Sequence, residues 1–120
     1  MRSYHHLGIP TTKSHPNEKY VPHLKIYVWG YDTSEYRIEW VRYAPGAESL
    51  YHPLMMQLPH VAFTVDNLKK ELEGKKLIWG PQESLRGFTV AFIEENEAPV
   101  ELIETKLSED DILKIVQQRS

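Results

Sequence analysis

Hydrophobic and polar residues alternate with a period of two along most of the chain, a pattern typical of strands that bury one face. In HVAFTV (positions 60–65), small or polar residues alternate strictly with large apolar ones. The same alternation predicts seven strands, at 4–10, 24–29, 36–43, 60–65, 77–79, 88–94 and 100–105. We therefore expect a fold dominated by β-strands.

Helical periodicity is confined to two places. The first is predicted at 67–73, with Asp66 or Asn67 placed as its N-cap and Gly74 as a typical C-terminal stop. The segment SEDDILKIVQQ (108–118) begins at Ser108, a second good N-cap, and carries an acidic first turn and an apolar stripe. Its place at the end of the chain predicts that it packs on the outside of the sheet.

The segments between these elements suggest how the chain is divided. Pro16 lies within residues 11–21 and Pro10 and Pro22 flank them, which predicts a loop. The WGP at 79–81 is typical of a turn. Residues 45–58 are expected to connect two halves. We expect one domain over 1–120, made of module one (about 1–44), this connector, module two (about 59–106) and the helix at 108–118.

The two halves begin and end alike. The first contains YHHLGIPT and later YRIEWVRY, and the second contains LPHVAFTV and later APVELIET. In each half a histidine leads an apolar strand and a glutamate lies inside a later one: His6 and Glu39, then His60 and Glu101. A repeat of this size predicts two βαβββ units that face one another.

Strand parity groups these four polar residues. Successive side chains on a strand point to opposite faces, so His60 shares a face with Ala62, and His6 shares one with Gly8. The large apolar face of each strand is expected to meet the core, which leaves the small-residue face lining a cavity. By the same rule the side chain of His5 is predicted to point away from this cavity.

Composition and charge narrow the function classes. The chain has 41% hydrophobic and 26% charged residues, a formal charge of -3 and no cysteine. These values are typical of an ordinary folded domain, give no basic surface for nucleic acid, and exclude disulfides and thiolate ligands. No segment approaches a membrane span or the apolar core of a signal peptide. We expect a cytoplasmic protein that binds a small molecule.

Two imidazoles and two carboxylates form a ligand set that suits a divalent transition metal such as Zn, Ni, Co, Mn or Fe. A single histidine at the start of a strand is more often an ordinary surface or core residue. Four such residues in a repeated register are better explained by a shared site. For contacts to a substrate anion, the sequence offers Arg37, Arg86 and Tyr43.

The motifs HHLGI, PHVAFTVDNL, FTVAFIEE and APVELIE, in this order, resemble the vicinal oxygen chelate superfamily. That superfamily includes glyoxalase I, methylmalonyl-CoA epimerase, extradiol dioxygenases and the bleomycin and fosfomycin resistance proteins. The resemblance is strongest over 58–105. It implies an α+β fold in which paired βαβββ modules form a cupped, mostly antiparallel sheet around a central site. The proline-broken segment 11–22 departs from the pattern, so we expect the first module to lack a regular helix.

The resemblance also implies a site and an activity. His6, Glu39, His60 and Glu101 match the family's metal ligands, and Glu39 or Glu101 would act as the catalytic base. The implied activity is isomerase, epimerase or lyase chemistry next to a carbonyl of a small metabolite, through a metal-stabilised enediolate. A homodimer is implied by resemblance alone.

Two other functions fit the sequence. The chain could be a metal-free protein that binds and sequesters a small apolar molecule, as bleomycin resistance proteins do. A third possibility is an Fe(II) oxygenase, in which Glu39 would have to leave the metal shell. Because one fold can carry many functions, these alternatives have to be distinguished by the geometry and chemistry of the site.

Overall fold

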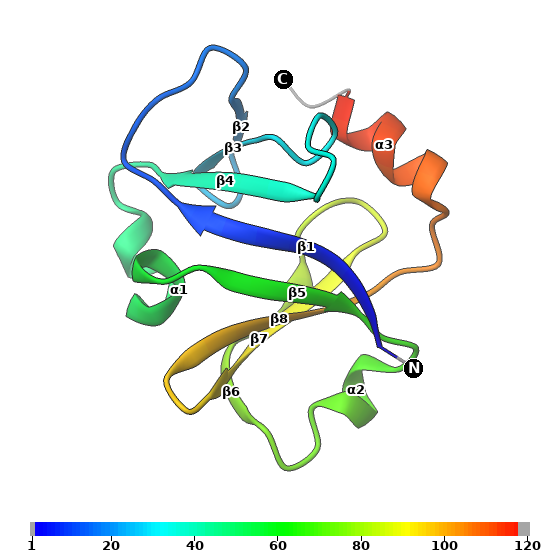
Figure 1. Ribbon diagram of the computed structural model, residues 1–120. Coiled ribbons are helices and arrows are strands. Elements are labelled where there is room, and N and C mark those ends of the chain that lie inside the picture. The colour runs from blue at the N-terminus through cyan, green and yellow to red at the C-terminus, as the bar shows by residue number, and fades with distance from the viewer. Residues whose placement is uncertain (1, 118–120) are drawn as a thin grey trace.

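A single eight-stranded sheet forms the centre of the computed structural model, which describes residues 2–117 (Figure 1). The strands are β1 (Ser3–Pro10), β2 (Lys19–Val21), β3 (Ile26–Trp29), β4 (Ile38–Tyr43), β5 (His60–Thr64), β6 (Lys76–Glu83), β7 (Thr89–Glu95) and β8 (Ala98–Glu104). The helices are the 3-10 turn η1 (Ala47–Ser49) and the α-helices α1 (Pro53–Gln57), α2 (Leu68–Glu71) and α3 (Glu109–Gln117). The predicted α+β class is confirmed.

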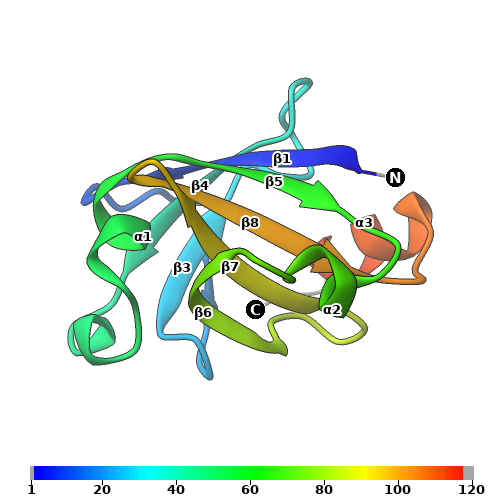
Figure 2. The ribbon, with the colours of Figure 1, turned by 90° about the horizontal axis from the view of Figure 1, so that it is seen from below.

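The strand order is β2-β3-β4-β1-β5-β8-β7-β6, and it repeats one pattern in both halves. β1 pairs in parallel with β4, β5 pairs in parallel with β8, and β1 and β5 join the halves as antiparallel neighbours. The two outer wings curl to the same side of the four central strands, as the view from below shows (Figure 2). This arrangement confirms the predicted cupped, mostly antiparallel sheet of two paired modules.

The convex face of module two is covered by α2. Leu68 and Leu72 pack there against Val65, Ala91 and Leu102, as the parity of these strands requires. Asn67 caps the helix by accepting a hydrogen bond from the amide of Lys70 at 3.1 Å. The helix predicted at 67–73 is therefore confirmed in a shorter form.

The concave face is filled in part by α3, and this corrects the sequence prediction. The apolar stripe of α3, Ile112 and Val116, packs with Phe88, Val90 and Ile103 on the inner side of the sheet rather than outside it. Ser108 caps the helix as predicted, because its Oγ accepts from the amide of Asp111 at 3.1 Å. The stripe goes inside because the inner face near Phe88 is itself apolar. Residue 118 of the predicted helix lies outside the described residues.

Short elements account for the remaining differences. Residues 11–18 form no helix, as expected for the first module, but the end of the predicted loop becomes β2. The predicted connector contains η1 and α1. The predicted turn at 79–81 is wrong, because β6 continues through it: Trp79 pairs with Phe92 and Gln82 with Val90, and a bulge holds the extra residue.

No helix within residues 2–117 is long and apolar enough to cross a membrane.

Candidate metal centre

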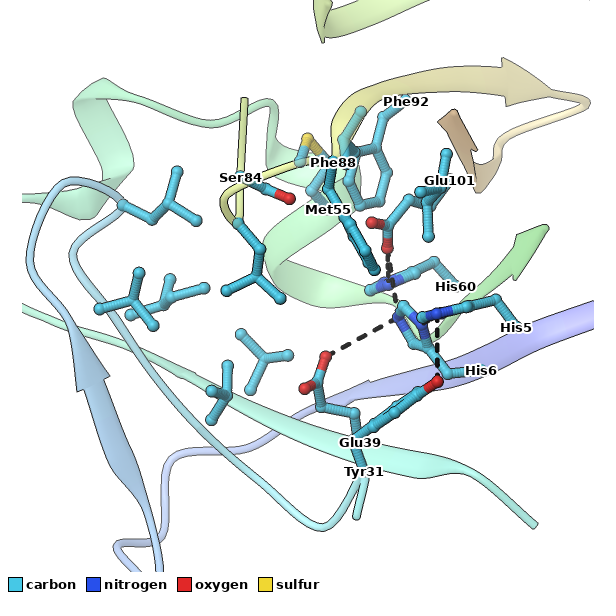
Figure 3. A pocket seen from close by; sticks show the side chains of 18 of the residues that line it. His5, His6, Tyr31, Glu39, Met55, His60, Ser84, Phe88, Phe92 and Glu101 are labelled. Atoms are coloured by element: carbon cyan, nitrogen blue, oxygen red, sulfur yellow. Dashed lines mark hydrogen bonds and ion pairs between the residues drawn. The ribbon is translucent and has the colours of Figure 1, made fainter. Parts of the chain in front are cut away.

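Cross-strand pairing places the four predicted polar residues on one face. Gly8 of β1 lies between Glu39 of β4 and His60 of β5, and Ala62 of β5 lies between His6 of β1 and Glu101 of β8. Paired residues on neighbouring strands point to the same side of a sheet. All four polar side chains line one cavity on the concave face (Figure 3). The parity of the strands could not establish this convergence; the pairing of β1 with β4 and β5, and of β5 with β8, brings it about.

His60 needs a residue without a side chain beside it, and Gly8 supplies this. A Cβ atom at this position would lie 2.1 Å from Cε1 and 2.4 Å from Nε2 of His60. The imidazole of His60 therefore lies directly over the backbone of β1. The absence of a side chain at position 8 lets the ring reach the centre of the site.

His6, His60 and Glu101 form a compact group at the floor of the cavity. Oε1 of Glu101 lies 3.2 Å from Nε2 of His6 and 2.9 Å from Nε2 of His60. The three residues are 5%, 7% and 9% exposed, and each offers one ligand atom within 4.8 Å of the others. Glu39 borders this group, with Oε1 3.8 Å from Nε2 of His6.

The donor set of this group fits a divalent metal ion. Nε2 of His60 is buried and, although Glu101 is close, has no partner with hydrogen-bond geometry among the described residues. Leaving such an atom unsatisfied in a protein interior costs on the order of 1–3 kcal/mol. Two imidazole nitrogens and a carboxylate oxygen are ligands that Zn, Ni, Co, Mn and Fe accept. A bound cation would satisfy His60 and Glu101 together.

The charge state of Glu101 agrees with a ligand role. Burial by itself would raise the pKa of this carboxyl group, but the rings of His6 and His60 outweigh burial and hold the pKa well below its usual range. Glu101 is therefore an anion at neutral pH, and only the ionised carboxylate binds metal well.

His5 is part of the cavity wall, contrary to the parity prediction. The pairing of β1 with β5 shifts between Tyr4 and His6, because Tyr4 pairs with Phe63 and His6 with the next residue, Ala62. This bulge places an extra residue in β1, and the alternation of side chains is lost there. A register shift of this kind leaves no signal in the alternation of apolar residues.

His5 connects His6 to Tyr31. Nδ1 of His5 lies 2.7 Å from Nδ1 of His6, and Nε2 of His5 lies 3.1 Å from the hydroxyl of Tyr31. Burial, followed by the neighbouring His6, lowers the pKa of His5 from 6.5 to about 4, so its ring is neutral at pH 7. A neutral ring can hydrogen-bond His6 and hold its orientation. Sequence reasoning missed His5 and Tyr31 as parts of the site.

Of the three residues predicted to contact a substrate anion, Arg37 and Tyr43 hydrogen-bond to other groups of the protein. The guanidinium of Arg37 donates to the carbonyl of Tyr31 and to Glu109, both at 2.8 Å. Neither Arg37 nor Arg86 lines the cavity. Tyr43 does line it, but its hydroxyl donates to the carbonyl of Met55 at 2.9 Å.

No protein-family model matches this chain, and no curated protein matches it by sequence. Solved structures do match. A hypothetical protein, BH1468 from Bacillus halodurans, is similar over 89% of this chain and 96% of its own, with a TM-score of 0.65 and 18% identity. The methylmalonyl-CoA epimerase of Mycobacterium tuberculosis is similar over 87% of this chain and 88% of its own, with a TM-score of 0.54 and 15% identity. At these identities the likeness is one of fold: the chain shares the fold of these two proteins.

Proposed function

We propose that the protein is a divalent-metal-dependent enzyme of the glyoxalase type, which moves a proton next to a carbonyl group of a small substrate. The observation that carries the proposal is the buried group of His6, His60 and Glu101, in which Oε1 of Glu101 lies 3.2 Å from Nε2 of His6 and 2.9 Å from Nε2 of His60. The fold likeness to an epimerase supports the same class of chemistry. Isomerase, epimerase and lyase reactions all fit this description.

His6, His60 and Glu101 would hold the metal, which is Zn, Ni, Co, Mn or Fe. When bound, the metal supplies a positive charge that stabilises the negative charge developing on substrate oxygens as the proton leaves. With Nε2 of His6 as a ligand, the proton of this ring sits on Nδ1 and is donated to His5. A hydrogen bond of this kind commonly orients metal-binding histidines.

Glu39 is the better candidate for the catalytic base. Glu101 has its pKa held low by two histidine rings and is therefore a weak base. Glu39 lies beside the compact group and lines the cavity, 3.8 Å from His6. A carboxylate in this place can reach a proton on a substrate held at the floor of the cavity.

The test is deuterium exchange from solvent into the carbon next to the carbonyl of 2-hydroxyacetophenone and hydroxyacetone, with metal-loaded protein. We expect exchange by the wild type, and a loss of roughly 100-fold or more in Glu39→Gln at unchanged metal content. Glu94→Gln is the matched control, because Glu94 lies in β7 and pairs with the exposed Lys76 at 3.0 Å. Equal exchange by wild type and Glu39→Gln would refute the role of Glu39.

Two alternatives have support of their own. The cavity walls are largely apolar, which favours a metal-free sequestering protein of the bleomycin-resistance type; tight ligand binding by protein that takes up no metal would identify it. Two histidines and one carboxylate are also the ligand set of many Fe(II) oxygenases. Oxygen uptake by the Fe(II)-loaded protein would identify that activity. The homodimer expected from the resemblance remains a prediction.

A further inference from the structure

A continuous series of aromatic rings leads away from the His–Glu group along the cavity wall. The ring of Phe92 packs edge-on against His60 at 4.8 Å and against Trp79 at 5.9 Å, and Trp79 stacks on Tyr51 at 5.6 Å. Tyr51 in turn meets Tyr43 edge-on at 5.1 Å. The rings come from β7, β6, the connector and β4. The cavity therefore has a polar end at the His–Glu group and an aromatic end at Tyr51 and Tyr43.

The polar atoms of this aromatic wall are used within the protein. The hydroxyl of Tyr43 donates to the carbonyl of Met55, the hydroxyl of Tyr51 to the carbonyl of Leu24, and the indole N–H of Trp79 to the carbonyl of Leu50. Each donor thus bonds to the main chain. What these three residues leave for a ligand is the apolar surface of their rings.

Aliphatic side chains complete the walls. Val28 and Val41 come from module one, and Ile112 and Val116 come from α3. Among residues 2–117, none that lines the cavity is a lysine or an arginine, and the formal charges there are the carboxylates at the polar end. A phosphate or carboxylate on the far end of a substrate would enter a low-dielectric region without a cation, which is costly.

The size of the cavity limits the ligand as well. Its volume is about 100 Å³. A water molecule needs roughly 10–15 Å³ of such space, so the cavity holds on the order of ten non-hydrogen atoms. One phenyl ring or a branched alkyl group with a two-oxygen head has this size.

We propose that the substrate is a small, uncharged molecule with an aromatic or branched apolar tail, whose tail lies against the ring series from Phe92 to Tyr43. The inference deepens the proposed function, because the oxygen-bearing head of the molecule is assigned to the metal group. The chemistry of the tail is inferred only from the residues that line the cavity walls. The same walls disfavour substrates with a phosphate or a nucleotide at this end.

Three probes that share one head and differ in the tail test the proposal by calorimetric titration. They are 2-hydroxyacetophenone (phenyl), hydroxyacetone (methyl) and dihydroxyacetone phosphate (anionic). We expect the phenyl compound to bind roughly 10–100-fold more tightly than the methyl compound, and the phosphate to bind no better than the methyl compound. Preference for the phosphate, equal affinity of phenyl and methyl, or no binding of the phenyl compound would overturn the inference.

Titrations with metal-loaded and chelator-treated protein separate the two proposals. A phenyl preference in both forms, with no metal bound in either, would support the tail assignment and refute the proposed function. Metal-dependent proton exchange without a phenyl preference would support the proposed function and refute the tail assignment.

Trp79→Ala and Trp40→Ala form a matched pair of variants. Trp79 lies in the cavity wall, whereas Trp40 stacks on Trp29 and does not line the cavity. We expect Trp79→Ala to weaken phenyl binding about tenfold or more and Trp40→Ala to leave it within about twofold. Should Trp79→Ala not fold, Tyr43→Phe serves: it keeps the ring and removes the hydroxyl bonded to Met55. Unchanged phenyl binding by Tyr43→Phe supports the proposal, and a tenfold loss contradicts it.

Discussion

Gly8→Ala tests the placement of His60 without reference to any metal. A methyl group at position 8 would lie 2.1 Å from Cε1, 2.4 Å from Nε2 and 2.8 Å from Nδ1 of the His60 ring. Carbon atoms in contact are normally about 3.5–4.0 Å apart, so the ring cannot stay where it is. Either His60 leaves the floor of the cavity or β1 moves away from β5.

The size of the effect follows from two opposing terms. Forcing an extra methyl group into a packed interior typically costs about 1–3 kcal/mol. Removing glycine from a strand gains roughly 0.5–1 kcal/mol, because the unfolded chain has less backbone freedom to lose. We expect Gly8→Ala to destabilise the wild type by about 1–2 kcal/mol. In a His60→Ala background the clash is absent, and the same substitution should stabilise the protein by about 0.5–1 kcal/mol.

Urea unfolding of the wild type, the two single variants and the double variant measures this coupling. The expected coupling between positions 8 and 60 is about 1.5–3 kcal/mol, within the range measured for residues in contact. Far-UV circular dichroism and tryptophan fluorescence should report the same midpoints. An equal effect of Gly8→Ala in both backgrounds would show that His60 does not lie over Gly8.

Three further predictions concern His5 and α3. The pKa of His5 is lowered from 6.5 in the unfolded chain to about 4 in the folded protein, so the unfolded chain takes up this proton at a higher pH than the folded protein does. The free energy of unfolding should therefore be highest above pH 6.5 and fall by roughly 2–3 kcal/mol on going to about pH 4.5. Urea midpoints of His5→Phe should lack this fall, and an equal fall in both proteins would contradict the assignment. The same variant should bind metal about 10–100-fold more weakly, because His6 loses its orienting partner; unchanged affinity in competition with a chelator would exclude that role. Ile112→Ala should destabilise the protein by about 2–4 kcal/mol, whereas Lys114→Ala on the exposed side of α3 should change stability by less than about 0.5 kcal/mol; equal urea midpoints would show that α3 does not pack inside the cup.

The central strands were predictable because their two faces differ in chemistry. Ala62 and Thr64 alternate with Val61 and Phe63, so period two fixed which face His60 belongs to, and the repeat extended the same logic to His6. The glutamates followed from the repeat in the same way. Convergence itself came from the parallel pairing of β1 with β4 and of β5 with β8.

The features that the sequence did not reveal depend on tertiary contacts. The bulge before His6 changes the direction of His5 without changing the pattern of apolar residues. β2 is three residues long and gains its order from pairing with β3. The apolar stripe of α3 has the same sequence pattern whether the helix packs on the convex or the concave face of the sheet. The apolar surface near Phe88 and Ile103 determines that it packs on the concave face. Arg37 was predicted to contact a substrate because the sequence does not show that its guanidinium bonds to the carbonyl of Tyr31 and to Glu109 of α3.

The most direct test of the account is the metal content of the protein purified without a histidine tag or chelator, compared with a His60→Ala, Glu101→Ala double variant. The account predicts about one divalent ion per chain in the wild type. It predicts loss of that ion in a double variant that remains folded by circular dichroism. A wild-type protein that contains no metal, and takes up none when Zn, Ni, Co, Mn or Fe(II) is added, would contradict the assignment of His6, His60 and Glu101 as ligands.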